Sequence, residues 1–169
     1  QNLHGSGPKD MIIITNPLFR EQADRLAAFH SSTDGMSVLV TEIGDVYNEF
    51  SSGAQDITAM RNFMKLLYDS APSGEEPKYL ALFGDASFDY KDKIENNSNF
   101  VPTWEAEESL NMVSSIASDD YYGFLDGPGD NLLDIGIGRL PVQTVEQATA
   151  AAILGLRPES IGDAGKDEA

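Results

Sequence analysis

Three short apolar runs, separated by stretches with helical spacing, constrain the fold of this chain most. Met11–Thr15 (MIIIT) and Tyr79–Phe83 (YLALF) are continuously apolar, and residues 37–43 (SVLVTEI) lie between them. Unbroken apolar runs of this length are typical of strands that are buried on both faces. Apolar residues between them recur every three or four positions, which indicates amphipathic helices. This alternation predicts an α/β fold, a three-layer sandwich with a mainly parallel sheet.

Capping residues place the helices around these strands. Asn16 and Pro17 supply an N-cap and a proline at the first helical position. Asp56 and Thr144 can cap two further helices. The helices are therefore expected over residues 17–30, 57–68 and 145–155.

The remaining segments are expected to be less regular. Residues 134–140 (DIGIGRL) predict a further strand, and residues 44–53 predict a loop that exposes Tyr47 and Phe50. No apolar run approaches the roughly 18 residues needed to cross a bilayer, so no membrane span is expected. The expected domain organisation is a mobile lead-in at 1–10, one domain over 11–156, and a polar disordered tail at 157–169.

The chain carries a net charge of −17, and much of it is concentrated in one segment. Residues 85–130 hold eleven acidic side chains and only two lysines. So acidic a chain repels phosphate, and nucleic acid is not expected as a partner. Carboxylates are the preferred ligands of calcium, which makes calcium the candidate cofactor. Its candidate ligands, each of which could instead stabilise a turn or be solvated, are Asp85, Asp89, Asp126 and Asp130.

Several charged residues follow or end predicted strands, where open parallel sheets collect their ligand-contacting groups. Asp85 directly follows the strand at 79–83. Asp119 and Asp120 are adjacent acids; one of them could face inward and bind a basic side chain, or both could be ordinary surface acids. Arg139 ends a strand in an acidic protein and is expected to form a structural ion pair with a loop aspartate.

Two other kinds of chemistry are excluded or disfavoured by the residues themselves. Gly136 and Gly138 lack the third glycine and the helix start of a dinucleotide-binding loop, so no nucleotide is expected. The sequence contains no cysteine and only two histidines, His4 and His30. These residues therefore cannot supply a disulfide, a thiolate metal site or a cysteine nucleophile.

Four segments nevertheless occur in the order and spacing of the gingipain family of cysteine peptidases. They are residues 79–89 (YLALFGDASFD), 101–103 (VPT), 118–123 (SDDYYG) and 134–142 (DIGIGRLPV). Over residues 10–156 the chain resembles this family, and within it the gingipain-like sortase of the bacterial type IX secretion system. The resemblance implies the first of two subdomains of a caspase-like catalytic domain, which is a Rossmann-like half domain.

The resemblance also implies a function. The catalytic histidine and cysteine would belong to the second subdomain, so this chain is expected to be the non-catalytic first half of a cysteine endopeptidase. It would be inactive alone, and its partners would be the second subdomain and protein substrates. Asp119 would line the pocket for a basic substrate residue, and Asp85 would lie near the place where the catalytic histidine docks. Asp119, Asp120 and Asp85 are therefore the candidate substrate-binding residues, and calcium binding would fit the family.

In the sortase, the implied reaction removes a C-terminal secretion signal from exported cargo. The resemblance therefore implies a bacterial protein that is exported to the periplasm, the outer membrane or the cell surface. The alternative interpretation is an α/β module that binds calcium or a basic peptide without a peptidase partner. The acidic loops are the sequence feature that favours this alternative.

Overall fold

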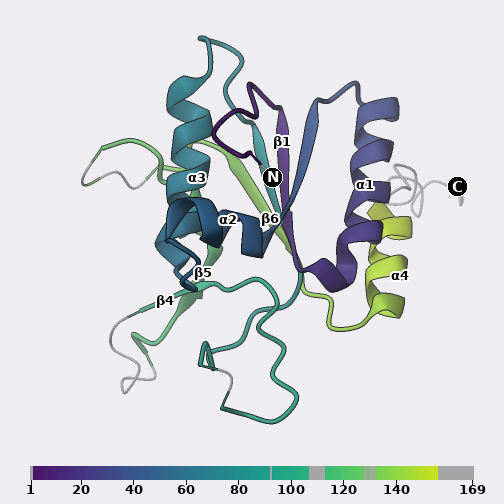
Figure 1. Cartoon of the computed structure of the whole chain (residues 1–169), viewed down its shortest axis with the longest axis vertical. Coiled ribbons are helices and arrows are strands. Elements are labelled where there is room, and N and C mark those ends of the chain that lie inside the picture. Colours follow the sequence, from purple (N-terminus) through teal and green to yellow (C-terminus); the bar gives the residue numbers. More distant parts are fainter. Residues whose placement is uncertain (1, 92, 107–112, 128, 130–131, 156–169) are drawn as a thin grey trace, which may run out of the picture.

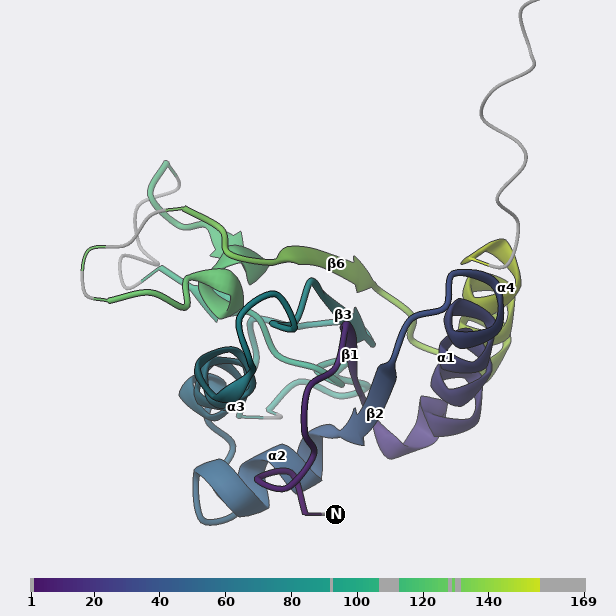
Figure 2. The same cartoon turned by 90° about the horizontal axis from the view of Figure 1, so that it is seen from above.

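Four strands form one parallel sheet in the order β2-β1-β3-β6. The computed structural model describes residues 2–91, 93–106, 113–127, 129 and 132–155. The sheet lies between two helical layers (Figures 1 and 2), which confirms the expected three-layer α/β fold. Its strands are Met11–Thr15 (β1), Val38–Glu42 (β2), Tyr79–Phe83 (β3) and Gly136–Leu140 (β6).

The two faces of the sheet are covered by different helices because side chains alternate along each strand. Even-numbered residues of β1 and β3 pack against α2 (Ile43–Phe50) and α3 (Ile57–Ser70). Odd-numbered residues of these strands face the other layer, α1 (Arg20–Thr33) and α4 (Val145–Gly155). All five residues of β1 are buried, as the continuous apolar run predicts for a central parallel strand.

The order of the strands places the loops that could carry function at one edge. The chain crosses from β1 to β2 on one side and from β3 to β6 on the other, so the direction reverses between β1 and β3. Ligands of open α/β sheets bind beyond the carboxyl ends of strands at such a point. The loop after β3 leaves the sheet at this end. The two-stranded sheet of β4 (Trp104–Glu105) and β5 (Ala117–Ser118) lies nearby on the α3 side (Figure 1), and the 3-10 helix η2 (Asp119–Gly123) packs on β6 and α3.

The predicted caps begin the helices. The Asn16 side chain accepts a hydrogen bond from Leu18 N at 3.0 Å, although a 3-10 turn, η1 (Pro17–Phe19), precedes α1. The Asp56 side chain accepts from Thr58 N at 2.8 Å at the start of α3. Short polar side chains satisfy the free amide groups of a first turn, which is why these starts are readable in the sequence.

The prediction of a loop over residues 44–53 is wrong. Ile43–Phe50 form the helix α2, and Tyr47 and Phe50 are half-buried against the core instead of exposed. The chain passes from β2 straight into α2, and the N-cap residue Glu42 makes no side-chain cap hydrogen bond. Without a turn residue or a cap, nothing local marks the start of this helix, and packing on α3 supports it instead.

The segment that the sequence suggests as a mobile lead-in contributes to the core. Leu3 is fully buried, and its N–H lies 2.9 Å from both carboxylate oxygens of Glu49. The His4 ring stacks on Phe50 with 4.7 Å between ring centroids. Leu3 and His4 therefore lie against α2, whereas the predicted tail at 157–169 is outside the described residues.

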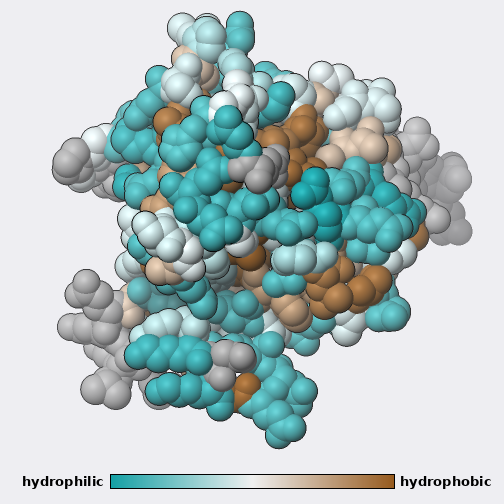
Figure 3. Space-filling model, viewed as in Figure 1, coloured by the Kyte–Doolittle hydropathy of each residue, from teal (hydrophilic) through white to brown (hydrophobic). Residues whose placement is uncertain are grey.

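The exterior matches the acidic composition. On the face seen in Figure 3, hydrophilic residues cover most of the surface and hydrophobic residues gather mainly between the layers of α3 and α1. Among the described residues, no helix has both the length and the apolar character needed to span a membrane.

Asp10 joins the amino ends of three strands. Its carboxylate accepts from Lys78 Nζ at 2.7 Å, from Ser37 N at 2.9 Å and from Ser37 Oγ at 2.7 Å. The hydrogen bond from Lys78, followed by those from Ser37, holds the pKa of Asp10 well below its usual range. A lowered folded-state pKa stabilises the protein above the unfolded-state pKa of about 3.9, and this contribution is lost as the pH falls toward the folded-state value.

We therefore expect Asp10→Asn to lower the Tm at pH 7, and the difference from the wild type to shrink progressively below about pH 4. Thermal melts followed by circular dichroism at several pH values would measure this. Asp24→Asn is the control, since Asp24 pairs with Arg20 one helical turn away on the surface of α1 and should change the Tm less. A Tm difference for Asp10→Asn that is the same at pH 3 and pH 7 would contradict the assignment.

Candidate functional site

Asp85 is held rigidly at the carboxyl end of β3. Its N–H donates to Val142 O at 3.0 Å, and its carbonyl accepts from Phe100 N and Val101 N at 3.1 and 3.0 Å. Its carboxylate Oδ2 accepts from Ser98 Oγ at 2.7 Å and from Gln143 Nε2 at 2.6 Å. The side chain is half-buried, so Asp85 is a fixed acceptor at the sheet edge and not a mobile surface acid.

The preceding residue, Gly84, explains how the chain leaves β3 at this point. Its φ is +150°, and a Cβ atom there would lie 3.0 Å from both Phe100 Cβ and Val101 Cγ2. Only glycine tolerates this approach without a shift of the loop. The carbonyl of Gly84 is thereby available to the side chain of Arg139.

Arg139 connects β6 with the end of β3, with residues 101–102 and with η2. Its Nε and Nη2 donate to Asp119 Oδ2 and Oδ1 at 2.7 and 2.6 Å, which is a bidentate ion pair. Nη1 donates to Gly84 O at 2.9 Å and to Val101 O at 2.6 Å, and Nη2 donates also to Pro102 O at 3.1 Å. The five donors of a guanidinium are matched by five acceptors, and the side chain is only 13% exposed.

Two further side chains, Tyr122 and Arg61, hold the helix η2, which carries Asp119. The buried hydroxyl of Tyr122 donates to Pro102 O at 2.8 Å, and burial raises the pKa of Tyr122, which keeps this donor protonated. Arg61 on α3 donates through Nε and Nη2 to Phe124 O at 2.9 and 2.5 Å. Asp119 is therefore anchored to the sheet, to α3 and to the loop at residues 101–102.

The adjacent acids Asp119 and Asp120 diverge. Both oxygens of Asp119 accept hydrogen bonds from Arg139, which is the loop-aspartate ion pair that the sequence predicts for this arginine. The side chain of Asp120 is exposed, and its backbone N–H donates to Ser118 Oγ at 3.2 Å. Of the two, Asp120 is the more accessible to a basic ligand.

The three described candidates for calcium ligands, Asp85, Asp89 and Asp126, do not form a metal-binding group. Asp89 is buried in its own loop, where Oδ2 accepts from Lys93 N and Ile94 N at 2.5 and 2.6 Å. Asp126 is exposed elsewhere, and Asp130 is outside the described residues. Within the described part of the chain, no group of three or more His, Asp or Glu residues could hold a metal ion. These described carboxylates do not form a calcium site, and calcium binding remains a prediction based on charge and resemblance.

Sequence reasoning missed the groups that position these acids. Ser98 and Gln143 bind Asp85 from positions 13 and 58 residues away, and Tyr122 reaches a carbonyl 20 residues away. Neighbouring residues in the sequence carry no signal for contacts of this kind, although the buried tyrosine is part of the segment at 118–123 that the resemblance singled out.

A parallel sheet with helices on both faces and an acidic carboxyl edge defines an α/β domain of the caspase-like kind. The model of peptidase family C25 matches residues 4–153, and the chain belongs to this family. The resemblance to the gingipains seen in the sequence is thus confirmed.

One solved structure gives a measure of this similarity. The dimeric latent PorU from Porphyromonas gingivalis matches with a TM-score of 0.76 and 35% sequence identity. The match covers 90% of this chain but only 16% of that chain, so the present chain spans a small part of its length. A comparison with curated proteins gave no match.

Proposed function

We propose that this chain is the first, non-catalytic half of a C25 cysteine peptidase domain. In this role it supplies a parallel-sheet scaffold and one wall of the substrate cleft. The observation that carries the proposal is the combination of a family match over residues 4–153 with a sequence that contains no cysteine. A cysteine peptidase needs a thiolate beside a base, and the thiolate has to come from residues other than these.

The two histidines support this division of roles, because each is engaged in contacts away from Asp85, Asp119 and Arg139. His4 Nδ1 lies 2.8 Å from Glu49 Oε2 and its ring stacks on Phe50. His30 Nδ1 lies 2.7 Å from Asp34 Oδ2, beside the first residues of β1 and β3. His4 is thus held against α2, and His30 lies near the amino ends of the strands; neither is among the residues that bond to Asp85, Asp119 or Arg139.

The acidic edge would face the substrate in this proposal. Asp85, Asp119 and Asp120 are the candidates to contact a basic substrate side chain. Asp120 is exposed, whereas Asp119 would have to share its carboxylate with Arg139. The resemblance to the type IX sortase supports exported proteins as substrates, processed in the periplasm or at the cell surface.

The test is reconstitution of activity from two parts. This chain is mixed with a separately produced second half of a C25 peptidase domain that carries the family's histidine and cysteine. We expect cleavage of a reporter peptide after a basic residue, blocked by iodoacetamide, and no cleavage by this chain alone. A second half with its cysteine replaced by alanine is the control. A folded 1:1 complex that stays inactive would contradict the proposal.

A further inference from the structure

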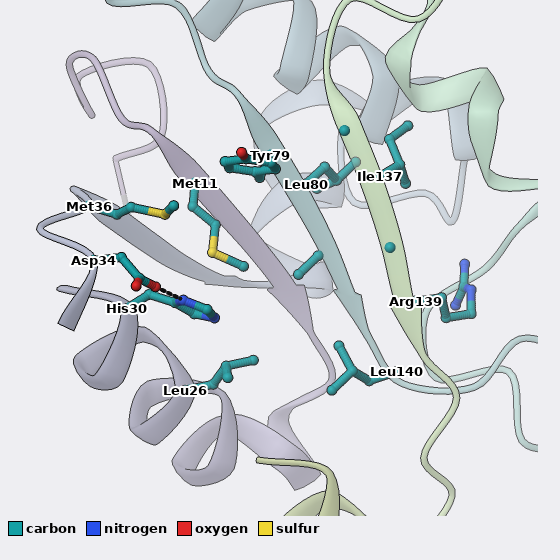
Figure 4. A pocket seen from close by; sticks show the side chains of 13 residues that line it. Met11, Leu26, His30, Asp34, Met36, Tyr79, Leu80, Ile137, Arg139 and Leu140 are labelled. Carbon is teal, nitrogen blue, oxygen red and sulfur yellow. Dashed lines mark hydrogen bonds and ion pairs between the residues drawn. The ribbon is translucent and has the colours of Figure 1, made fainter. Parts of the chain in front are cut away.

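An apolar trough of about 570 Å³ lies on the α1 side of the sheet. Figure 4 shows its lining: α1 and the residues after it form one side, β6 forms the other, and side chains of β1 and β3 lie between them. Its floor includes Gly136 and Gly138, which present no side chain. Tyr79 is 45% exposed at this site, although it belongs to a central strand. Apolar side chains that contribute to the lining are Met11, Leu26, Met36, Tyr79 and Leu140.

The trough exists because no described helix covers this part of the sheet. α4 packs on α1 and η1, and Figure 2 shows α1 and α4 side by side with β6 away from both. None of the described α4 side chains, which end at residue 153, lines the trough. Parallel sheets are ordinarily buried on both faces, so an open face over β3 and β6 indicates a missing partner.

The outer edge of β6 is open next to the trough. Gly136 N donates to Lys78 O at 2.8 Å and Leu140 O accepts from Gly84 N at 3.0 Å, so alternate residues of β6 bond to β3. The peptide groups of Ile137 and Arg139 point to the other side, because hydrogen-bonding direction alternates along a strand. None of the described strands pairs with that side of β6.

We propose that the trough is the docking surface for the second half of the peptidase domain, which lays an apolar helix over Gly136 and Gly138. This proposal rests on the proposed function. Two observations favour the second half of the domain as the partner that fills the trough. The solved relative has most of its length outside the part that this chain matches. The last described helix, α4, packs on α1, which forms one wall of the trough, so the polypeptide that follows α4 in a C25 domain starts on the same face.

The two glycines suit a helix at this position. A helix packs closely on a sheet where the strand offers no side chain, and its apolar residues would meet those of the trough walls. A Cβ atom at Gly138 would meet no other atom within 4 Å, so this space is open to the partner. A larger residue at position 138 would occupy the same space without a clash inside this chain.

Gly138→Val therefore tests the surface. Valine favours the strand conformation and should leave the Tm of the chain unchanged or raised. We expect the Kd for a separately produced second half of a C25 domain, measured by calorimetry, to rise at least about tenfold. Gly127→Val is the matched control: its Cβ also meets no atom within 4 Å, and it lies in an exposed loop outside the trough. The control should bind within about twofold of the wild type.

The outcomes separate this proposal from the proposed function. Equal binding by Gly138→Val and the wild type would overturn the docking surface and leave the proposed function standing. No binding by any variant would overturn both. A third outcome is that this chain self-associates and that Gly138→Val abolishes the self-association. Such a result would assign the trough to a second copy of the chain and overturn its assignment to the second half of the peptidase domain. If Gly138→Val does not fold, Tyr79→Lys is the second variant, because it places a charge in the trough at an exposed position. Its Kd for the second half should rise in the same way, and an unchanged Kd would overturn the docking surface.

Discussion

Replacing Arg139 by methionine is expected to lower the free energy of unfolding by about 3–5 kcal/mol. The change leaves the Asp119 carboxylate, whose side chain is 22% exposed, without its partner. It also removes the donors that bind Gly84 O, Val101 O and Pro102 O. Each group left without a hydrogen bond in a low-dielectric setting adds its own desolvation cost. Urea denaturation followed by circular dichroism would measure the loss.

Arg20→Met is the matched control for this change. It alters the net charge by the same amount, but the Arg20 side chain is 37% exposed and pairs with Asp24 on α1 and, at 3.8 Å, with Glu42. Exposed ion pairs of this kind contribute at most about 1 kcal/mol. Similar losses of unfolding free energy for the two variants would show that the hydrogen bonds of Arg139 stabilise the protein no more than a surface ion pair does. Adding Asp119→Asn to Arg139→Met should cost less than the sum of the single changes, because the two residues form one pair.

The second large effect is expected at the amino end of the described chain. Leu3→Ala should lower the free energy of unfolding by about 2–5 kcal/mol, since it removes a fully buried side chain and leaves a cavity in the cluster around α2 and α3. The same measurement on Leu18→Ala serves as the control, because Leu18 is 51% exposed and its loss should cost under about 1 kcal/mol.

This comparison decides the status of residues 2–10. If Leu3→Ala were as mild as Leu18→Ala, the segment would be a lead-in, as its polar composition suggests. A large loss instead makes it a part of the domain. The family match, which begins at residue 4, agrees with the second outcome.

Some of the site could be predicted from the sequence and some could not. Asp85 was identifiable because it follows an apolar run, and the carboxyl ends of parallel strands carry ligand groups. The partner of Arg139 could be predicted only as a class of residue. Asp119 lies twenty residues away along the chain, and the choice among the loop aspartates depends on how η2 packs on β6.

The sequence by itself determined the four strands of the parallel sheet, the capped helices and the family, because runs of neighbouring residues or ordered motifs indicate each of them. β1 and β3 have the bounds that their apolar runs indicate. The tertiary structure alone decided three things: that residues 43–50 form a helix, that Leu3 is buried, and that Asp119 is already paired. Each depends on contacts between distant segments, for which packing and burial, and not local propensity, supply the stabilising free energy.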